Sequence, residues 1–142
     1  MAFAEKSNVV YAAATLFWFG VYVAVVLAGV QHTPLVDVPY AAPMLLTIAG
    51  AIVVSIVGRV AVAVTWPRDV DKRDERDRQI AHLGDRVGNW VAVIAGGAAL
   101  LLTMAKLDSF WIANTIYLGF VGSALLGSII RAAAYRGAFQ TW

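Results

Sequence analysis

Long apolar stretches alternate with short polar segments along the whole chain. Four stretches are almost free of charge, at about residues 9–30, 41–66, 87–105 and 110–130, and Arg59 is the charged residue inside them. Each is about as long as a helix that crosses a ~30 Å hydrocarbon core at ~1.5 Å per residue. Because a backbone in lipid must satisfy its hydrogen bonds internally, the pattern predicts an all-α integral membrane protein. We expect a four-helix bundle made of two antiparallel hairpins.

Composition supports one membrane domain that covers residues 1–142. The chain is 61% hydrophobic and only 14% charged, whereas about 25% of the residues in a soluble domain are charged. A water-soluble fold could not bury this much apolar surface. The chain has no cysteine, which excludes disulfides and thiol chemistry. Residues 1–8 lack the basic cluster of a signal peptide, so we expect the first stretch to remain as a span.

The distribution of lysine and arginine predicts the orientation. Four spans place residues 1–8, the loop 67–86 and residues 131–142 on one side of the membrane. That side carries nine of the eleven basic residues, and the opposite side carries Lys106 alone. Basic residues favour the cytoplasmic side. We therefore expect cytoplasmic termini, a cytoplasmic loop 67–86 and a multi-pass protein of the plasma membrane.

The loop contains the most distinctive polar segment, KRDERDRQI at residues 72–80. Acids and bases alternate there, which argues against direct nucleic-acid binding, and Asp74 precedes Arg78 by the favourable four-residue spacing. The third helix is expected to begin near Lys72, in the cytoplasm. The segment is either a solvated, self-neutralised helix start or a docking surface for a protein partner or a neighbouring subunit. The docking residues would be Asp74, Glu75, Arg76, Asp77, Arg78 and Asp85.

Small residues recur at four-residue spacing in the spans. In lipid, helices associate mainly by close packing over such residues. We therefore expect the helices to pack over Gly84, Gly88, Gly96, Gly119 and Gly127.

Few polar side chains lie inside the spans. A charge at the depth of Arg59 costs at least a few kcal/mol and normally faces a partner or the bundle interior. Asp85 is the expected partner, and the alternative is that Arg59 extends to lipid phosphates. In a third interpretation, Arg59 serves a ligand or a transported species. The candidate residues of such a path are Arg59, Ser55, Asn114 and Ser123.

The sequence offers no catalytic arrangement. It contains no set of nucleophile, histidine and acid, no glycine-rich phosphate loop and no paired carboxylates within the spans. His82 and Asp85 are only two potential metal ligands on one helix face. We therefore expect no enzymatic activity, no cofactor and no metal.

Three segments resemble a family of small bacterial, especially actinobacterial, membrane proteins. They are the opening MAFAEKSN, the DERDRQI run, and an ending in which Tyr135, Arg136, Gly137 and Phe139 form a YRxGF-type motif. The resemblance covers most of the chain. It implies the four-helix layout and, because members are often encoded beside small helix-turn-helix regulators, a regulatory partner. It transfers no catalytic residue.

Three functions follow as expectations. The first is a non-enzymatic membrane protein that acts through protein–protein contacts, with a regulatory or sensing role. The alternative is a small channel or transporter that works as a homo-oligomer, because four helices rarely enclose a pore. The third is an accessory subunit of a larger membrane complex.

Overall fold

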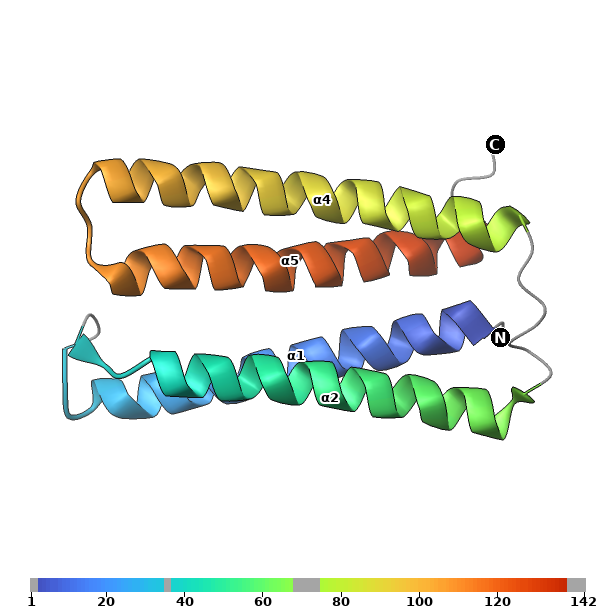
Figure 1. The fold of residues 1–142 in the computed structure, drawn as a ribbon, viewed down its shortest axis with the longest axis horizontal. Helices are drawn as coiled ribbons and strands as arrows, with labels where there is room; N and C mark the ends of the chain where they lie inside the picture. The colour runs from blue at the N-terminus through green and yellow to red at the C-terminus, as the bar shows by residue number, and fades with distance from the viewer. Residues whose placement is uncertain (1–2, 35–36, 68–74, 138–142) are drawn as a thin grey trace.

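The computed structural model describes residues 3–34, 37–67 and 75–137. These residues form four helices and no strand (Figure 1). The helices confirm the predicted all-α class. All four are long and apolar enough to cross a membrane, as a multi-pass membrane protein requires. The helices are α1 (Phe3–Val30), α2 (Ala41–Thr65), α4 (Glu75–Met104) and α5 (Ser109–Tyr135).

The helix ends follow from local chemistry. The amide of Trp66 still donates to the carbonyl of Val62, at 2.9 Å, but Pro67 has no N–H and α2 ends before it. Between α4 and α5 the chain turns sharply at Lys106, whose φ of 58° is left-handed. The helix α4 extends well before its apolar stretch, as expected; Lys72 and Asp74 lie outside the described residues.

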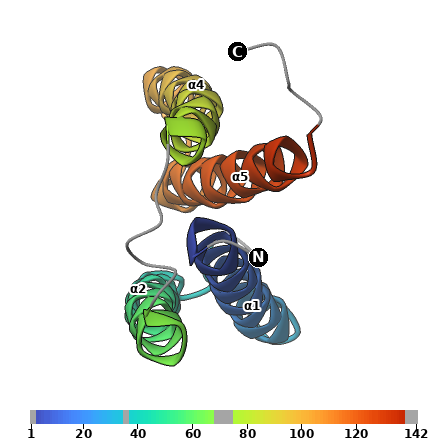
Figure 2. The same ribbon diagram turned by 90° about the vertical axis from the view of Figure 1, so that its right-hand side faces the viewer.

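The bundle is open rather than closed around a central axis. Viewed end-on, the helices follow one another in the order α2, α1, α5 and α4 (Figure 2). The most extensive contact joins α4 to α5, a second joins α1 to α2, and the α1–α5 contact connects these two pairs. Each outer helix, α2 or α4, therefore packs along one helix neighbour.

Glycines allow α4 and α5 to approach closely. A Cβ on Gly84 or on Gly127 would lie 3.0 Å from the carbonyl oxygen of the other residue, and Gly119 faces Ala95. A Cβ on Gly88 would lie 3.0 Å from the Ser123 hydroxyl. The expectation for Gly96 is wrong, because a Cβ there would meet nothing within 4 Å. Gly96 lies on the exposed side of α4, which faces no other helix of the described residues.

The α1–α2 contact uses other glycines. Gly50 gives space to the indole of Trp18, and Gly58 gives space to Val10. At the end of this pair, the Lys6 ammonium lies 4.0 Å from the centre of the Trp66 ring, a cation–π contact between the start of α1 and the residue after α2.

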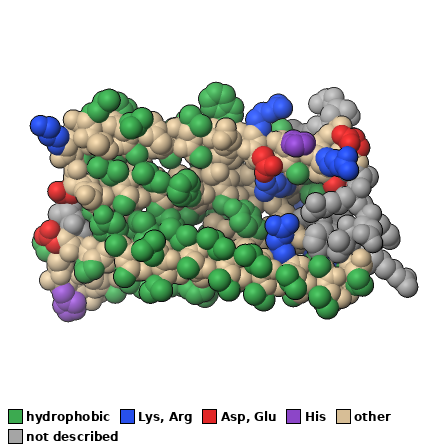
Figure 3. Space-filling model, viewed as in Figure 1, with side chains coloured by type: hydrophobic (Ala, Val, Ile, Leu, Met, Phe, Trp, Pro, Cys, Tyr) green, Lys and Arg blue, Asp and Glu red, His purple; other side chains and the backbone are tan. Residues whose placement is uncertain are grey.

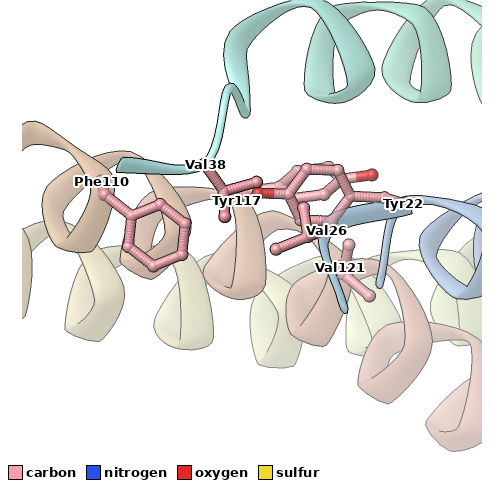
Figure 4. Close-up of a cluster of buried hydrophobic side chains, with 6 residues drawn as sticks. All are labelled: Tyr22, Val26, Val38, Phe110, Tyr117 and Val121. Carbon is pink, nitrogen blue, oxygen red and sulfur yellow. The ribbon is translucent and has the colours of Figure 1, made fainter. Parts of the chain in front are cut away.

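A buried cluster joins α1, α5 and the connection that precedes α2 (Figure 4). The rings of Tyr22 and Tyr117 meet edge to face, with centroids 4.8 Å apart. The Tyr22 hydroxyl donates a hydrogen bond to Asn114 Oδ1, and the Tyr117 hydroxyl lies 3.1 Å from Thr47 Oγ1. These contacts satisfy polar groups in an apolar environment and link α5 to α1 and α2. The buried cluster comprises Tyr22, Val26, Val38, Phe110, Tyr117 and Val121.

Candidate functional site

A polar pocket lies where all four helices contribute side chains. Its volume is about 390 Å³, within the usual range of small-ligand sites. The pocket is towards the end of the molecule where lysine and arginine side chains gather (Figure 3). Its lining residues are Ser7, Asn8, Tyr11, Arg59, Ala81, Asp85, Arg131 and Tyr135.

An ion pair across the α4–α5 contact forms one wall of the pocket. Arg131 Nη2 donates to Asp85 Oδ1. The Arg131 side chain is only 22% exposed, whereas that of Asp85 is 66% exposed. The expected pairing of Asp85 with Arg59 is wrong. The reason is that α4 packs along α5, so Asp85 lies opposite Arg131, next to the close approach of Gly84 and Gly127.

Arg59 lines the other side of the pocket. Within the described residues it makes no hydrogen bond and no ion pair, and it is exposed. It lies six residues before the end of α2, or ~9 Å along the helix axis. A guanidinium at this depth requires an anion or hydration, and the described residues supply no anion for it.

The start of α1 supplies two buried polar residues. Ser7 and Asn8 are each only 7% exposed. Asn8 Nδ2 donates to the Ser128 carbonyl at 2.9 Å, but Ser7 Oγ and Asn8 Oδ1 have no hydrogen-bond partner. Buried polar atoms without partners are rare and require an explanation.

Ser7 and Asn8 were not among the site residues predicted from the sequence, because they precede the first apolar stretch. A signal was nevertheless present. Ser7 lies seven residues before Ala14, a spacing that keeps both residues on one helix face, and Ala14 is buried.

An apolar cleft begins at Arg59 and runs between α1, α2 and α5. Its volume is about 370 Å³. Arg59 and Tyr11 line both the cleft and the polar pocket. Ser55, one of the predicted intramembrane polar residues, lies in the cleft as well. The apolar part of the lining includes Trp18, Ile48, Ile52, Phe120 and Val121.

The other two predicted polar residues lie elsewhere. Ser123 contacts the backbone region of Gly88 in the α4–α5 contact, and Asn114 is bonded to Tyr22 and to the Phe110 carbonyl. Neither residue lines the cleft that contains Ser55 and Arg59, and the expectation that all four form one path in an oligomer stays a prediction. Ser123 contributes to the contact between α4 and α5, whereas Asn114 bonds to α1 and within α5.

At the start of α4, some charged residues are exposed and another contacts α5. Glu75 and Arg78 form an ion pair at 3.8 Å with side chains 71% and 70% exposed, which contributes little stability. Arg76 instead donates to the Ala134 carbonyl of α5, at 3.4 Å. Asp77 also has an interaction with another group. Asp74, and with it the expected pairing of Asp74 with Arg78, lies outside the described residues.

No protein-family model matches the chain, and no curated protein or solved structure is significantly similar to it.

Proposed function

We propose that the chain is a plasma-membrane protein that acts without catalysis, through contacts with other proteins. Its helices would form two antiparallel hairpins with cytoplasmic termini. The observation that carries this proposal is the start of α4, where a transmembrane helix continues into an exposed segment with charges of both signs. Glu75, Arg78, His82 and Arg86 are all exposed there.

The open arrangement of the helices supports association. Each outer helix has one helix neighbour along its length, so α2 and α4 present broad apolar faces, with Val64 74% and Met104 77% exposed. In a bilayer such faces meet lipid or another helix. A homo-oligomer, or a partner with its own membrane helices, would cover part of them.

The orientation is tested with single cysteines, because the chain contains none. Cysteine introduced at His82 should react with a membrane-impermeant maleimide only after cells are opened, since the positive-inside rule places this end in the cytoplasm. Cysteine at Lys106 should react in intact cells. The reverse labelling pattern would contradict the proposed orientation.

Protein contacts at α4 are tested by exchanging the exposed ion pair. The double variant Glu75→Arg/Arg78→Glu keeps the net charge and the local pairing. It exchanges the positions of the positive and the negative charge that a partner would contact. Such reversal places like charges opposite each other in a complementary interface. In its own membranes, the wild type should co-purify with a partner protein in fixed ratio. We expect the amount of this partner recovered with the double variant to fall by about tenfold or more.

Lys106→Glu is the matched control, because it reverses an exposed charge at the opposite end of the molecule. It should retain the partner in full, and circular dichroism should show equal helix content in all three proteins. Unchanged recovery of the partner with the exchanged pair, or a wild type that carries no partner at all, would refute contacts at this segment.

The rival functions have narrower support. A channel or transporter is favoured by Arg59, which lines a polar pocket and has no partner among the described residues. Of the four residues expected along the path, however, only Ser55 and Arg59 line the apolar cleft. An accessory role in a larger complex would use the same exposed faces of α2 and α4.

A further inference from the structure

The polar pocket and the apolar cleft adjoin at Arg59 and Tyr11, which line both. A ligand that fills both cavities needs a polar head and an apolar tail. We propose that they bind one anionic glycerophospholipid, from the leaflet at the N-terminal ends of α1 and α4. Its phosphodiester lies at Arg59 and one acyl chain lies in the cleft. This binding does not depend on the protein contacts proposed for α4.

The charges of the pocket match a headgroup with one negative charge. Among the described residues, three charged groups line it, namely Arg59, Arg131 and Asp85, and their formal sum is +1. Asp85 is engaged by Arg131, so the uncompensated charge is the guanidinium of Arg59. A guanidinium binds phosphate oxygens through paired N–H donors, and its geometry suits them better than an ammonium does. A single phosphodiester restores neutrality.

The unpartnered atoms of Ser7 and Asn8 add a preference for the headgroup. The Ser7 hydroxyl can donate to a phosphate oxygen, whereas Asn8 Oδ1 can only accept a hydrogen bond. A headgroup that carries hydroxyl groups beside its phosphate supplies the donor that Asn8 lacks. Phosphatidylglycerol combines one negative charge with such hydroxyls, and phosphatidylcholine has neither the net charge nor the donors.

The length of the cleft suits an extended acyl chain. Along α2 the lining extends from Arg59 to Ile48, eleven residues or about 16.5 Å at 1.5 Å per residue. An acyl chain that starts beside Arg59 and fills the cleft therefore reaches past the middle of α2. Trp18, Ile52 and Phe120 line this part. Inorganic phosphate would leave the cleft empty, so the lipid rather than the free anion is the ligand that uses both cavities.

The test measures lipid retained by the purified full chain in a neutral detergent, with native mass spectrometry and thermal unfolding as readouts. Wild type should retain one phosphatidylglycerol and gain thermal stability from it. Phosphatidylcholine and inorganic phosphate at matched concentration should do neither. Arg59→Gln should weaken phosphatidylglycerol binding by about tenfold or more. Arg86→Gln is the control, because it removes an exposed arginine from the same end of the molecule but outside both cavities.

Ala51→Trp provides a second variant that keeps Arg59. Ala51 lines the cleft, so the larger side chain should displace the acyl chain and weaken phosphatidylglycerol binding in a correctly folded protein. It also decides the question if Arg59→Gln does not fold. Equal retention of phosphatidylglycerol and phosphatidylcholine by the wild type would overturn the proposal. Equal effects of Arg59→Gln and Arg86→Gln, or stabilisation by inorganic phosphate as large as that by the lipid, would overturn it too.

Discussion

Gly88→Leu is expected to destabilise the protein by about 1–3 kcal/mol, the usual cost of forcing a larger side chain into a packed interface. Gly88 is buried, and a Cβ there would lie 3.0 Å from Ser123 Oγ and 3.1 Å from the Ser123 carbonyl oxygen. A hydroxyl can rotate away, but a backbone carbonyl within a helix cannot. The longer side chain therefore has to move α4 away from α5, which carries the largest helix–helix contact of the described chain.

Gly96→Leu is the matched control for this effect. It lies on the same helix and makes the same chemical change, but a Cβ at Gly96 would meet nothing within 4 Å. Replacing a helical glycine gains helix propensity, of about 0.5–1 kcal/mol, in both variants. The difference between them therefore isolates the packing cost. Thermal unfolding in detergent, followed by circular dichroism, should rank Gly88→Leu well below Gly96→Leu. Equal midpoints would show that α4 and α5 are not tightly packed at Ser123.

Asp85→Asn should destabilise the protein more than Arg131→Gln does. Removing the carboxylate charge leaves the Arg131 guanidinium, 22% exposed, without its counter-ion, and we expect a cost of about 1–3 kcal/mol. Removing the arginine leaves Asp85, which is 66% exposed and can be hydrated, so the expected cost is below about 1 kcal/mol. Denaturant or thermal unfolding of both variants measures the difference.

The double variant Asp85→Asn/Arg131→Gln separates the energy of the ion pair from the effects of the two single substitutions. It removes both charges together, so it should be more stable than Asp85→Asn alone, and the double-mutant cycle should give a favourable coupling. Additive effects would mean that the ion pair contributes nothing. A larger cost for Arg131→Gln would mean that the arginine acts mainly through its packing against Gly84.

The sequence was sufficient to predict the helices because a bilayer allows few alternatives for an apolar stretch. It was less informative about which faces meet. Four-residue spacing marks Gly84, Gly88 and Gly96 alike, yet α4 turns Gly84 and Gly88 towards α5 and leaves Gly96 exposed. Small residues reduce the cost of close approach on any side of a helix, and the actual side depends on the neighbouring helix.

At the site, too, the sequence did not predict which side chains contact each other. Arg59 stands out in the sequence because a charge inside an apolar stretch is costly. Its expected partner Asp85 is bonded to Arg131, because the order of the helices brings α4 to α5 rather than to α2. Ser7 and Asn8 lie before the apolar stretch, in a segment that reads as a polar flank. They are buried because α1 begins at Phe3 and packs beside Ser128 of α5.

The two helices of each pair are joined at one end by a connecting segment and contact each other at the other end. The α1–α2 pair is joined by residues 31–40 at one end and by Lys6 and Trp66 at the other. The α4–α5 pair is joined by its tight turn and, at the far end, by Arg76 and the Ala134 carbonyl. The first pair can therefore finish folding while the ribosome is still synthesising the second. Assembly then reduces to the meeting of two preformed halves in the plane of the bilayer, along the contact between α1 and α5.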